Sequence, residues 1–188
     1  MHLSLKELED GLDFIKQSPK ENGKVEHIVC RPEVGTRRDL EAGELDLKLG
    51  LVGDNWKTRG NRKTPDGAAH PDTQLNLMNS RVIELIAKTR DRWKLAGDQL
   101  YVDLDLSPDN LPPGTELAIG DAIIQVTAEP HLGCKKFMER YGKDATVFVN
   151  SKQGKAINLR GVNAKVIKPG HVRTGDVIRK IGLGDSGN

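Results

Sequence analysis

The stretch from Gln99 to Ala128, QLYVDLDLSPDNLPPGTELAIGDAIIQVTA, decides the fold of this chain. Leucine or valine occupies every second position from Leu100 to Leu106, which is typical of a β-strand with one buried face. Two more short apolar runs, TELAIG and AIIQVTA, follow a turn rich in proline and glycine. Short strands at such close spacing predict an antiparallel barrel or sandwich.

Strands and helices are also predicted on either side of this stretch. Apolar runs separated by turn residues predict further strands at residues 24–31, 45–51, 145–150, 164–168 and 176–180. Ser4 and Glu7 have the spacing of a capping box, and an apolar stripe follows, so an amphipathic helix is expected from Ser4 to Lys16. A second helix is expected at residues 79–97, ended by a glycine. The chain is therefore predicted to be mainly β, with a few peripheral helices.

The composition of the chain makes some classes of function unexpected. Lys and Arg number 29 against 27 Asp and Glu, and aromatic residues are only 4% of the chain, so nucleic-acid binding is not expected. No apolar run is long enough to cross a membrane, and the acidic N-terminus does not resemble a targeting peptide. Two widely spaced cysteines suit a reducing compartment, so we expect a cytoplasmic protein.

The stretch EPHLGCKKFMERYGK, residues 129–143, raises the question of function. Cys134 is expected at the N-terminus of a helix, where unpaired N–H groups, the helix dipole, Lys135 and Lys136 favour a thiolate. A thiolate attacks electrophiles and binds soft metals. The alternative is a buried core cysteine, which is also how we interpret Cys30 within its apolar strand.

Two groups of residues are candidates for a metal site. His131 and Cys134 lie three residues apart, but the remaining histidines and Cys30 do not supply a zinc ligand set. Asp98, Asp103 and Asp105 form a second candidate cluster, which a divalent ion could occupy. The alternating pattern favours another interpretation of Asp103 and Asp105, as the solvated face, with Tyr101, of a half-buried strand.

From Val25 to Lys180 the sequence resembles the MOSC domain, named after the C-terminal domain of molybdenum cofactor sulfurase. The resemblance is carried by VEHIVCRPEVGTR, GLVGDNW, GDQL and LPPGTELAIGDAIIQV, followed by the region of residues 126–180 that contains the cysteine. It implies a MOSC-type β-barrel at residues 23–182, preceded by a helix and linker at 1–22 and followed by a flexible tail at 183–188.

The resemblance also implies a role for Cys134. In one role it is the ligand of molybdenum held by a pterin dithiolene, in an oxidoreductase that reduces N-hydroxylated compounds with electrons from a separate protein. In the other it carries a persulfide received from a pyridoxal-phosphate-dependent desulfurase. No pyridoxal phosphate site is visible in the chain itself.

A molybdenum cofactor carries a phosphate, so basic residues are expected around it. The candidates are Arg59, Lys135, Lys136, Arg140 and Arg160, each of which could instead belong to a solvated basic surface. Asp98 and Gln99 occupy the positions of Glu and Asn in the family's Gly-Glu-Asn-Leu element and are also expected at the cofactor. Asn55 and Trp56 depart from the Arg-His that often follows the family's Gly-Asp.

Overall fold

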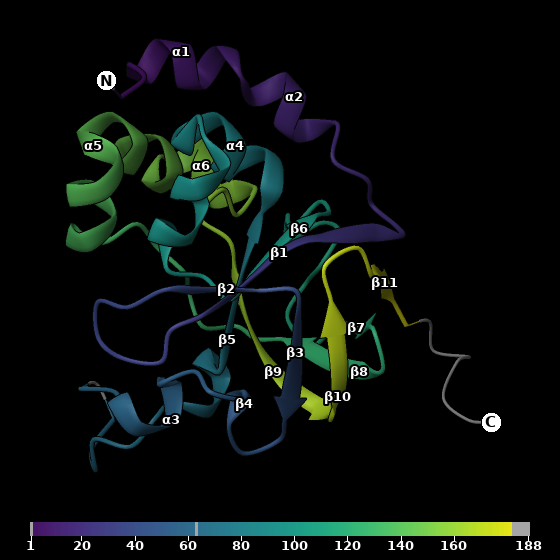
Figure 1. Cartoon of the computed structure of the whole chain (residues 1–188). Helices are drawn as coiled ribbons and strands as arrows, with labels where there is room; N and C mark the ends of the chain where they lie inside the picture. Colours follow the sequence, from purple (N-terminus) through teal and green to yellow (C-terminus); the bar gives the residue numbers. More distant parts are fainter. Residues whose placement is uncertain (1, 63, 182–188) are drawn as a thin grey trace.

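Seven strands close into a barrel (Figure 1). The computed structural model of the chain describes residues 2–62 and 64–181. The ring runs β11-β7-β8-β9-β5-β6-β1 and closes through pairing of β1 with β11. The bounds are β1 (Gly23–Cys30), β5 (Leu75–Asn79), β6 (Leu100–Asp103), β7 (Glu116–Ile119), β8 (Ala122–Val126), β9 (Val162–Lys168) and β11 (Val177–Lys180). The predicted barrel class is confirmed.

The barrel is mixed, because β5 and β6 pair in parallel while the other neighbours pair antiparallel. A parallel pair needs a crossover, which here is α4 (Ser80–Ala87) followed by the 3₁₀-helix η2 (Arg90–Ala96). The single helix predicted at 79–97 is thus divided at Lys88, whose φ is 66°. Its predicted ends are correct: Asn79 caps α4, and Gly97 ends η2 in the left-handed conformation.

A smaller sheet lies beside the barrel, formed by β3 (Ala42–Asp46), β4 (Gly50–Leu51) and β10 (Gly170–Arg173), while β2 (Arg38–Leu40) pairs with β1. The continuous strand predicted at 45–51 is wrong, because the chain turns there. The carboxylate of Asp46 accepts hydrogen bonds from the N–H groups of Lys48 and Leu49, at 2.8 and 2.9 Å. Such Asp-centred turns compete with the extended strand.

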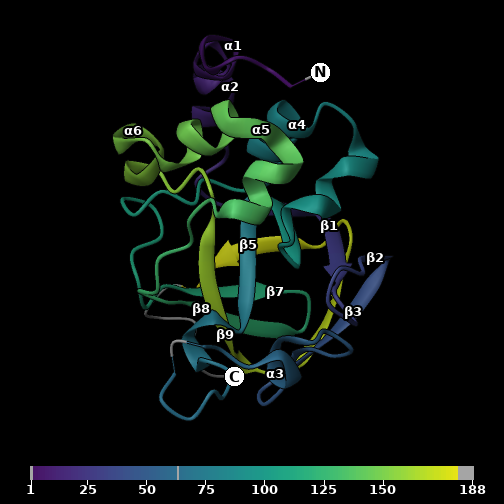
Figure 2. The ribbon, with the colours of Figure 1, turned by 90° about the vertical axis from the view of Figure 1, so that its left-hand side faces the viewer.

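Helices gather at one end of the barrel (Figures 1 and 2). They are α4, α5 (Lys135–Asn150) and α6 (Lys152–Ala156), with α1 (Leu5–Asp10) and α2 (Leu12–Lys16) outermost. The strand predicted at 145–150 is wrong, since these residues form the second half of α5. Ala145, Phe148 and Val149 are buried at helical spacing, a period that a short apolar run does not reveal. A kink at Gly142, with φ 88°, separates the two halves.

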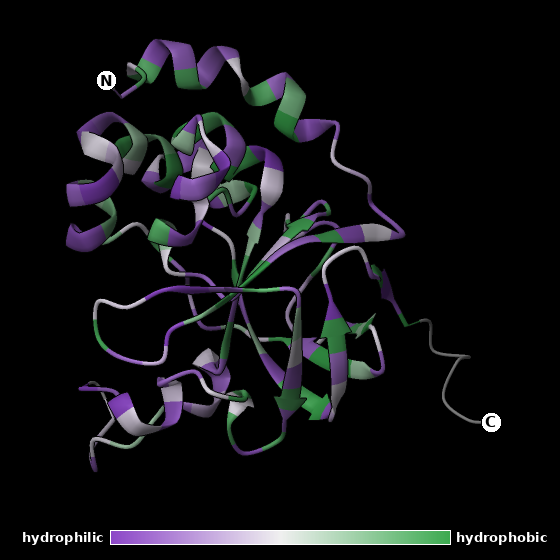
Figure 3. Cartoon of the chain, viewed as in Figure 1, coloured by the Kyte–Doolittle hydropathy of each residue, from purple (hydrophilic) through white to green (hydrophobic). Residues whose placement is uncertain are grey.

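Two apolar clusters stabilise the molecule. One fills the barrel, and the other lies between the barrel and the helices. Tyr101 belongs to the second cluster, is fully buried and donates a hydrogen bond to the carbonyl of Trp93 at 2.7 Å. The expected wet face of β6 is therefore wrong at Tyr101, because helices cover it. Hydrophobic and hydrophilic segments alternate along the outer helices in Figure 3, as expected for elements with one covered side.

The described helices include none with the length and apolar character that crossing a bilayer demands. The tail expected at 183–188 lies outside the described residues.

The N-terminal helices are expected to be removable without loss of the barrel. The capping box of Ser4 and Glu7 is present, and Leu8 and Ile15 are buried in the helix-side cluster. No barrel strand pairs with residues 2–22. Deletion of residues 1–22 should therefore leave a folded protein that has lost a few kcal/mol of stability from exposed apolar area. Thermal melting with near-ultraviolet circular dichroism tests this, and an insoluble or unfolded truncation would place the helices in the obligatory core.

Candidate functional site

Cys134 presents its thiol at the start of α5, as predicted. It is the N-cap residue, has extended backbone angles (φ −109°, ψ 179°), and its side chain is exposed. The preceding Gly133 is held at both backbone groups by the side-chain amide of Asn150, at 2.9 and 2.8 Å. Cys30 is buried at the end of β1, where burial and then Asp54 raise the pKa of its thiol. Of the two thiols, that of Cys134 is therefore the accessible one, and the residue before it is held in place by Asn150.

Three of the predicted basic residues are exposed. Lys135 and Lys136 lie in the first turn of α5, and Arg59 ends α3 (Trp56–Arg59). Within residues 2–62 and 64–181, none of the three forms an ion pair with a carboxylate. Their charge is available to an anion, or simply to solvent.

A buried charge network lies behind the Cys134 loop and centres on Asp98, which follows Gly97 at the end of η2. The carboxylate is fully buried, and Arg160 donates to its two oxygens at 2.9 and 2.8 Å. The Nε2 atom of His131 lies 2.7 Å from one of them. Burial alone would raise the pKa of Asp98, but Arg160 and His131 outweigh it and hold the pKa at about 2. Asp98 is therefore an anion that anchors Arg160 and His131.

A second buried network extends from the other side of Gly97. Asp54 is fully buried and accepts a bidentate pair from Arg31, at 2.8 and 2.9 Å. Arg31 also donates to the carbonyl of Gly97 at 2.8 Å and to Asn76 at 3.1 Å. The amide of Gln99 accepts from the N–H of Asn76 at 2.8 Å. Gln99 is thus enclosed by protein partners, and the turn at residues 97–99 is fixed from both sides.

Three residues predicted to bind the cofactor are buried within these networks. Asp98 and Gln99 have no exposed surface, and Arg160 is 5% exposed and paired with Asp98. In this arrangement their polar groups are bonded to other groups of the protein.

Two further arginines meet over Gly97. A Cβ placed on this glycine would lie 3.5 Å from an Nη atom of Arg37 and 3.9 Å from one of Arg140. Arg37 donates to the carbonyl of Thr36 at 2.7 Å, and Arg140 donates to that of Leu95 at 2.6 Å. Burial, then Arg140, then Arg31 lower the pKa of Arg37, and its buried Nε has no partner among the described residues. Cations thus converge here, and no carboxylate in the described part of the chain pairs with Arg37 or Arg140.

Sequence reasoning found Arg140 but missed Arg31 and Arg37. Both follow β1 in the segment CRPEVGTRR, whose two separated arginine positions were the available signal. The meeting of Arg37 with Arg140 depends on the left-handed Gly97, where φ is 89° and no side chain occupies the space. This long-range contact could not be read from spacing.

The carboxylate cluster is absent. Asp98 pairs with Arg160 and His131, Asp103 pairs with Arg81, and Asp105 accepts from the N–H of Ser107. Among the described residues, no group of three or more His, Cys, Asp or Glu side chains is arranged to hold a metal ion. The interpretation of Asp103 and Asp105 as the solvated face of a strand is met only in part, because both are half-buried and β6 ends at Asp103.

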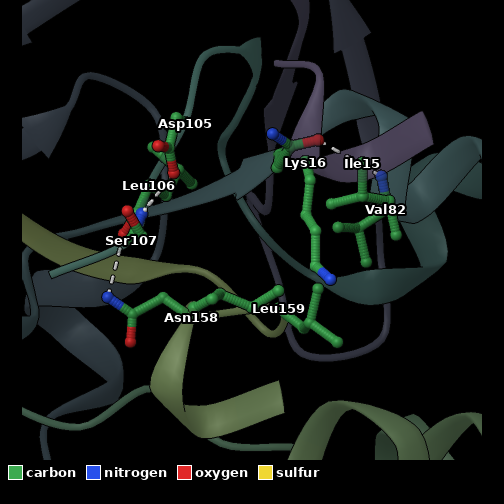
Figure 4. Close-up of a pocket in the computed structure, with 10 residues that line it drawn as sticks. Ile15, Lys16, Val82, Asp105, Leu106, Ser107, Asn158 and Leu159 are labelled. Atoms are coloured by element: carbon green, nitrogen blue, oxygen red, sulfur yellow. Dashed lines mark hydrogen bonds between the residues drawn. The ribbon is translucent and has the colours of Figure 1, made fainter. Parts of the chain in front are cut away.

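The chain has two relevant cavities. One, below α2, holds only about 90 Å³, and Lys16 extends across it towards Leu159 (Figure 4). Some of its polar groups are already used, as in the bond from Asn158 to the carbonyl of Leu106 at 2.9 Å. The other holds about 320 Å³ and is bordered by His131 and Leu132, directly before Cys134. Small-molecule sites usually exceed roughly 300 Å³. Two other hollows, of about 420 and 360 Å³, also reach this size, but neither includes the loop before Cys134 in its lining. The cavity beside that loop is therefore the candidate.

Comparison with solved structures identifies the fold. The YuaD protein of Bacillus subtilis superposes with a TM-score of 0.62 at 19% identity, covering 84% of this chain and 94% of that one. YiiM of Escherichia coli gives a TM-score of 0.54 at 20% identity, covering 85% and 70%. YiiM of Geobacillus stearothermophilus gives 0.57 at 14% identity, covering 87% and 77%. At such identities the likeness concerns the fold alone.

Comparison at the level of sequence gives the family. No curated protein matches the chain. The family profile of the MOSC domain matches residues 64–179, which is more than half of the chain and includes both the 97–99 turn and Cys134. With the barrel and the single exposed cysteine in place, the chain belongs to the MOSC domain family.

Proposed function

We propose that this protein binds a molybdenum cofactor, with Cys134 as a metal ligand, and reduces N-hydroxylated compounds. The observation that carries the proposal is that one helix bears both an exposed thiol and an arginine that no carboxylate of the described residues neutralises. Cys134 caps α5, and Arg140, on the same helix, meets Arg37 over Gly97. A thiolate suits a soft or borderline metal, and guanidinium groups suit a phosphate.

The residues present fit such a group. Within residues 2–62 and 64–181, the guanidinium groups of Arg37 and Arg140 bond only to backbone carbonyls, so their remaining N–H groups can hold phosphate oxygens. The missing side chain of Gly97 leaves room for that approach. The exposed Arg59, Lys135 and Lys136 would add positive charge around it. Arg31 and Arg160 are already neutralised, by Asp54 and Asp98, and support the site from below.

When bound, the cofactor supplies the centre at which two electrons are exchanged. The overall change converts an N–OH group, two electrons and two protons into N–H and water. A separate donor protein supplies the electrons. The task of this chain is to ligate the metal through Cys134, hold the phosphate and shape the substrate pocket.

Metal content tests the proposal. Protein purified from a host that makes the cofactor should contain molybdenum, and the double variant Arg37→Met/Arg140→Met should lose most of it. Each lost charge-assisted hydrogen bond typically costs about 1.5–3 kcal/mol, which is at least tenfold in affinity. The matched control Lys135→Met/Lys136→Met removes the same charge from an exposed position and should lose far less. Parent protein that never acquires molybdenum would contradict the proposal.

The sulfur-carrier alternative has its own supporting observation. The thiol of Cys134 is exposed at a helix N-terminus, where a partner desulfurase holding pyridoxal phosphate could reach it. In that case the protein should purify without molybdenum, and intact-mass analysis should find one additional sulfur on Cys134.

A further inference from the structure

The pocket of about 320 Å³ is bordered by the residues directly before Cys134, and Arg160 is the one predicted cofactor residue in its lining. Its lining comes from the loop before Cys134, from α5 and α6, and from the segment that leads into β9: Pro130, His131, Leu132, Val149, Gly154, Lys155, Asn158 and Arg160. Arg31, Arg37 and Arg140 are not among them. The volume is at the lower end of the range for small-molecule sites, roughly 300–1,000 Å³. It therefore suits a small ligand.

His131 is the polar group of this pocket whose protonation pattern the structure fixes. Its Nε2 lies 2.7 Å from Asp98, a fully buried carboxylate that also binds Arg160. An ionised carboxylate only accepts hydrogen bonds, so Nε2 carries the hydrogen. Burial and then Arg160 lower the pKa of His131, although Asp98 acts in the opposite direction. The lowered pKa favours the neutral ring. The lone pair is then on Nδ1, which has no partner in the described part of the chain.

The other residues of the lining determine which further groups a ligand of His131 would contact. Pro130, Leu132 and Val149 offer apolar surface. The charge of Arg160 is neutralised by Asp98, whereas Lys155 is exposed and its charge is not paired among the described residues. The lining thus combines apolar walls, the acceptor nitrogen of His131, the side-chain amide of Asn158 and a cation.

We propose that this is the substrate pocket, and that His131 Nδ1 accepts a hydrogen bond from the N–OH group of an uncharged ligand with a small apolar body. The inference rests on the proposed function and adds to it a substrate class and a specificity-determining residue. Reduction of an amidoxime yields an amidine, a strong base that is cationic in water. Lys155 would disfavour this product and assist its release.

Binding provides the first test and does not require turnover. The probe is benzamidoxime, and its O-methyl ether is the matched control because it lacks the hydroxyl donor. In ¹⁵N-histidine spectra of the full chain, benzamidoxime should shift the His131 Nδ1 resonance, and the ether should bind about tenfold more weakly, as expected for one hydrogen bond. Equal binding of the two compounds, or an unchanged His131, would overturn the inference.

Two variants separate ligand recognition from folding. His131→Gln keeps an N–H donor near the Nε2 position, facing Asp98, but removes the acceptor at Nδ1. It should melt close to the parent and raise KM for benzamidoxime about tenfold. His131→Asn loses the bond to Asp98 but keeps an acceptor near Nδ1, so it should melt lower and raise KM less.

The matched control Lys152→Met removes an exposed charge from α6, outside the lining of the pocket, and should leave KM within about twofold. A parent enzyme that turns over with molybdenum while His131→Gln keeps its KM would overturn this inference alone. A parent without molybdenum-dependent turnover would overturn the proposed function, and the binding experiment would still decide the role of His131.

Discussion

Replacing Cys134 with serine is expected to abolish molybdenum-dependent turnover while leaving the fold intact. The side chain is exposed and makes no cap hydrogen bond, so the change should cost within about 0.5 kcal/mol of stability. The hydroxyl is hard and remains protonated, so it cannot replace a thiolate as a ligand of a soft metal. Molybdenum content and reduction of benzamidoxime should both fall to background, with the melting temperature close to that of the parent.

Cys30→Ser is the matched control. Cys30 is 3% exposed, so its replacement by a hydroxyl should cost about 1–3 kcal/mol of stability, because a polar group is buried without a provided partner. Turnover per folded molecule should persist. The opposite result, with full activity in the Cys134 variant and none in the Cys30 variant, would remove Cys134 from the chemistry.

Replacing Asp98 with asparagine is expected to give the largest loss of stability. The change keeps the shape of the side chain but leaves Arg160 buried without its counter-ion. Breaking a buried pair in this way typically costs about 3–5 kcal/mol, which corresponds to a fall in melting temperature of roughly 6–20 °C for a chain of this size. The double variant Asp98→Asn/Arg160→Met removes both charges and should recover part of the loss. A single variant as stable as the parent would contradict the ion pair.

The same variant has a defined pH signature. The pKa of Asp98 is about 2 in the folded protein, below its ordinary value of 3.8. A lowered folded pKa adds stability that is fully present above the ordinary pKa and is lost as the pH falls through the folded one. The stability difference between parent and Asp98→Asn should therefore be constant above about pH 4 and shrink between pH 4 and 2. Urea unfolding of both proteins across this range measures it.

The sequence allowed the barrel to be predicted because most of its strands are short apolar runs bounded by turn residues. It failed at residues 145–150, where β-branched residues imitate a strand but tertiary packing imposes a helix. The strand prediction also failed at 45–51, where hydrogen bonds to the side chain of Asp46 stabilise a turn. Both errors arise because local patterns do not contain the competing interaction.

The candidate site was predictable only where its residues are contiguous. Cys134 and its lysines lie together in the chain, so their setting at a helix start could be inferred. The network of Asp98, Arg160 and His131 joins residues 62 and 33 positions apart. Arg37 reaches Gly97 from another part of the chain altogether. Contacts of this kind depend on the completed topology, which spacing does not encode.

Closure of the barrel through β1 and β11 has a consequence for biosynthesis. Gly23 is opposite Ile178, so one of the first strands to be synthesised must wait for one of the last before the ring can close. Pairings between such distant segments form slowly. Until then the edges of β1 and β11 are open to pairing with other chains. Any cofactor held by this barrel would therefore be inserted after translation of β11, and proteins that protect nascent chains would matter most during that interval.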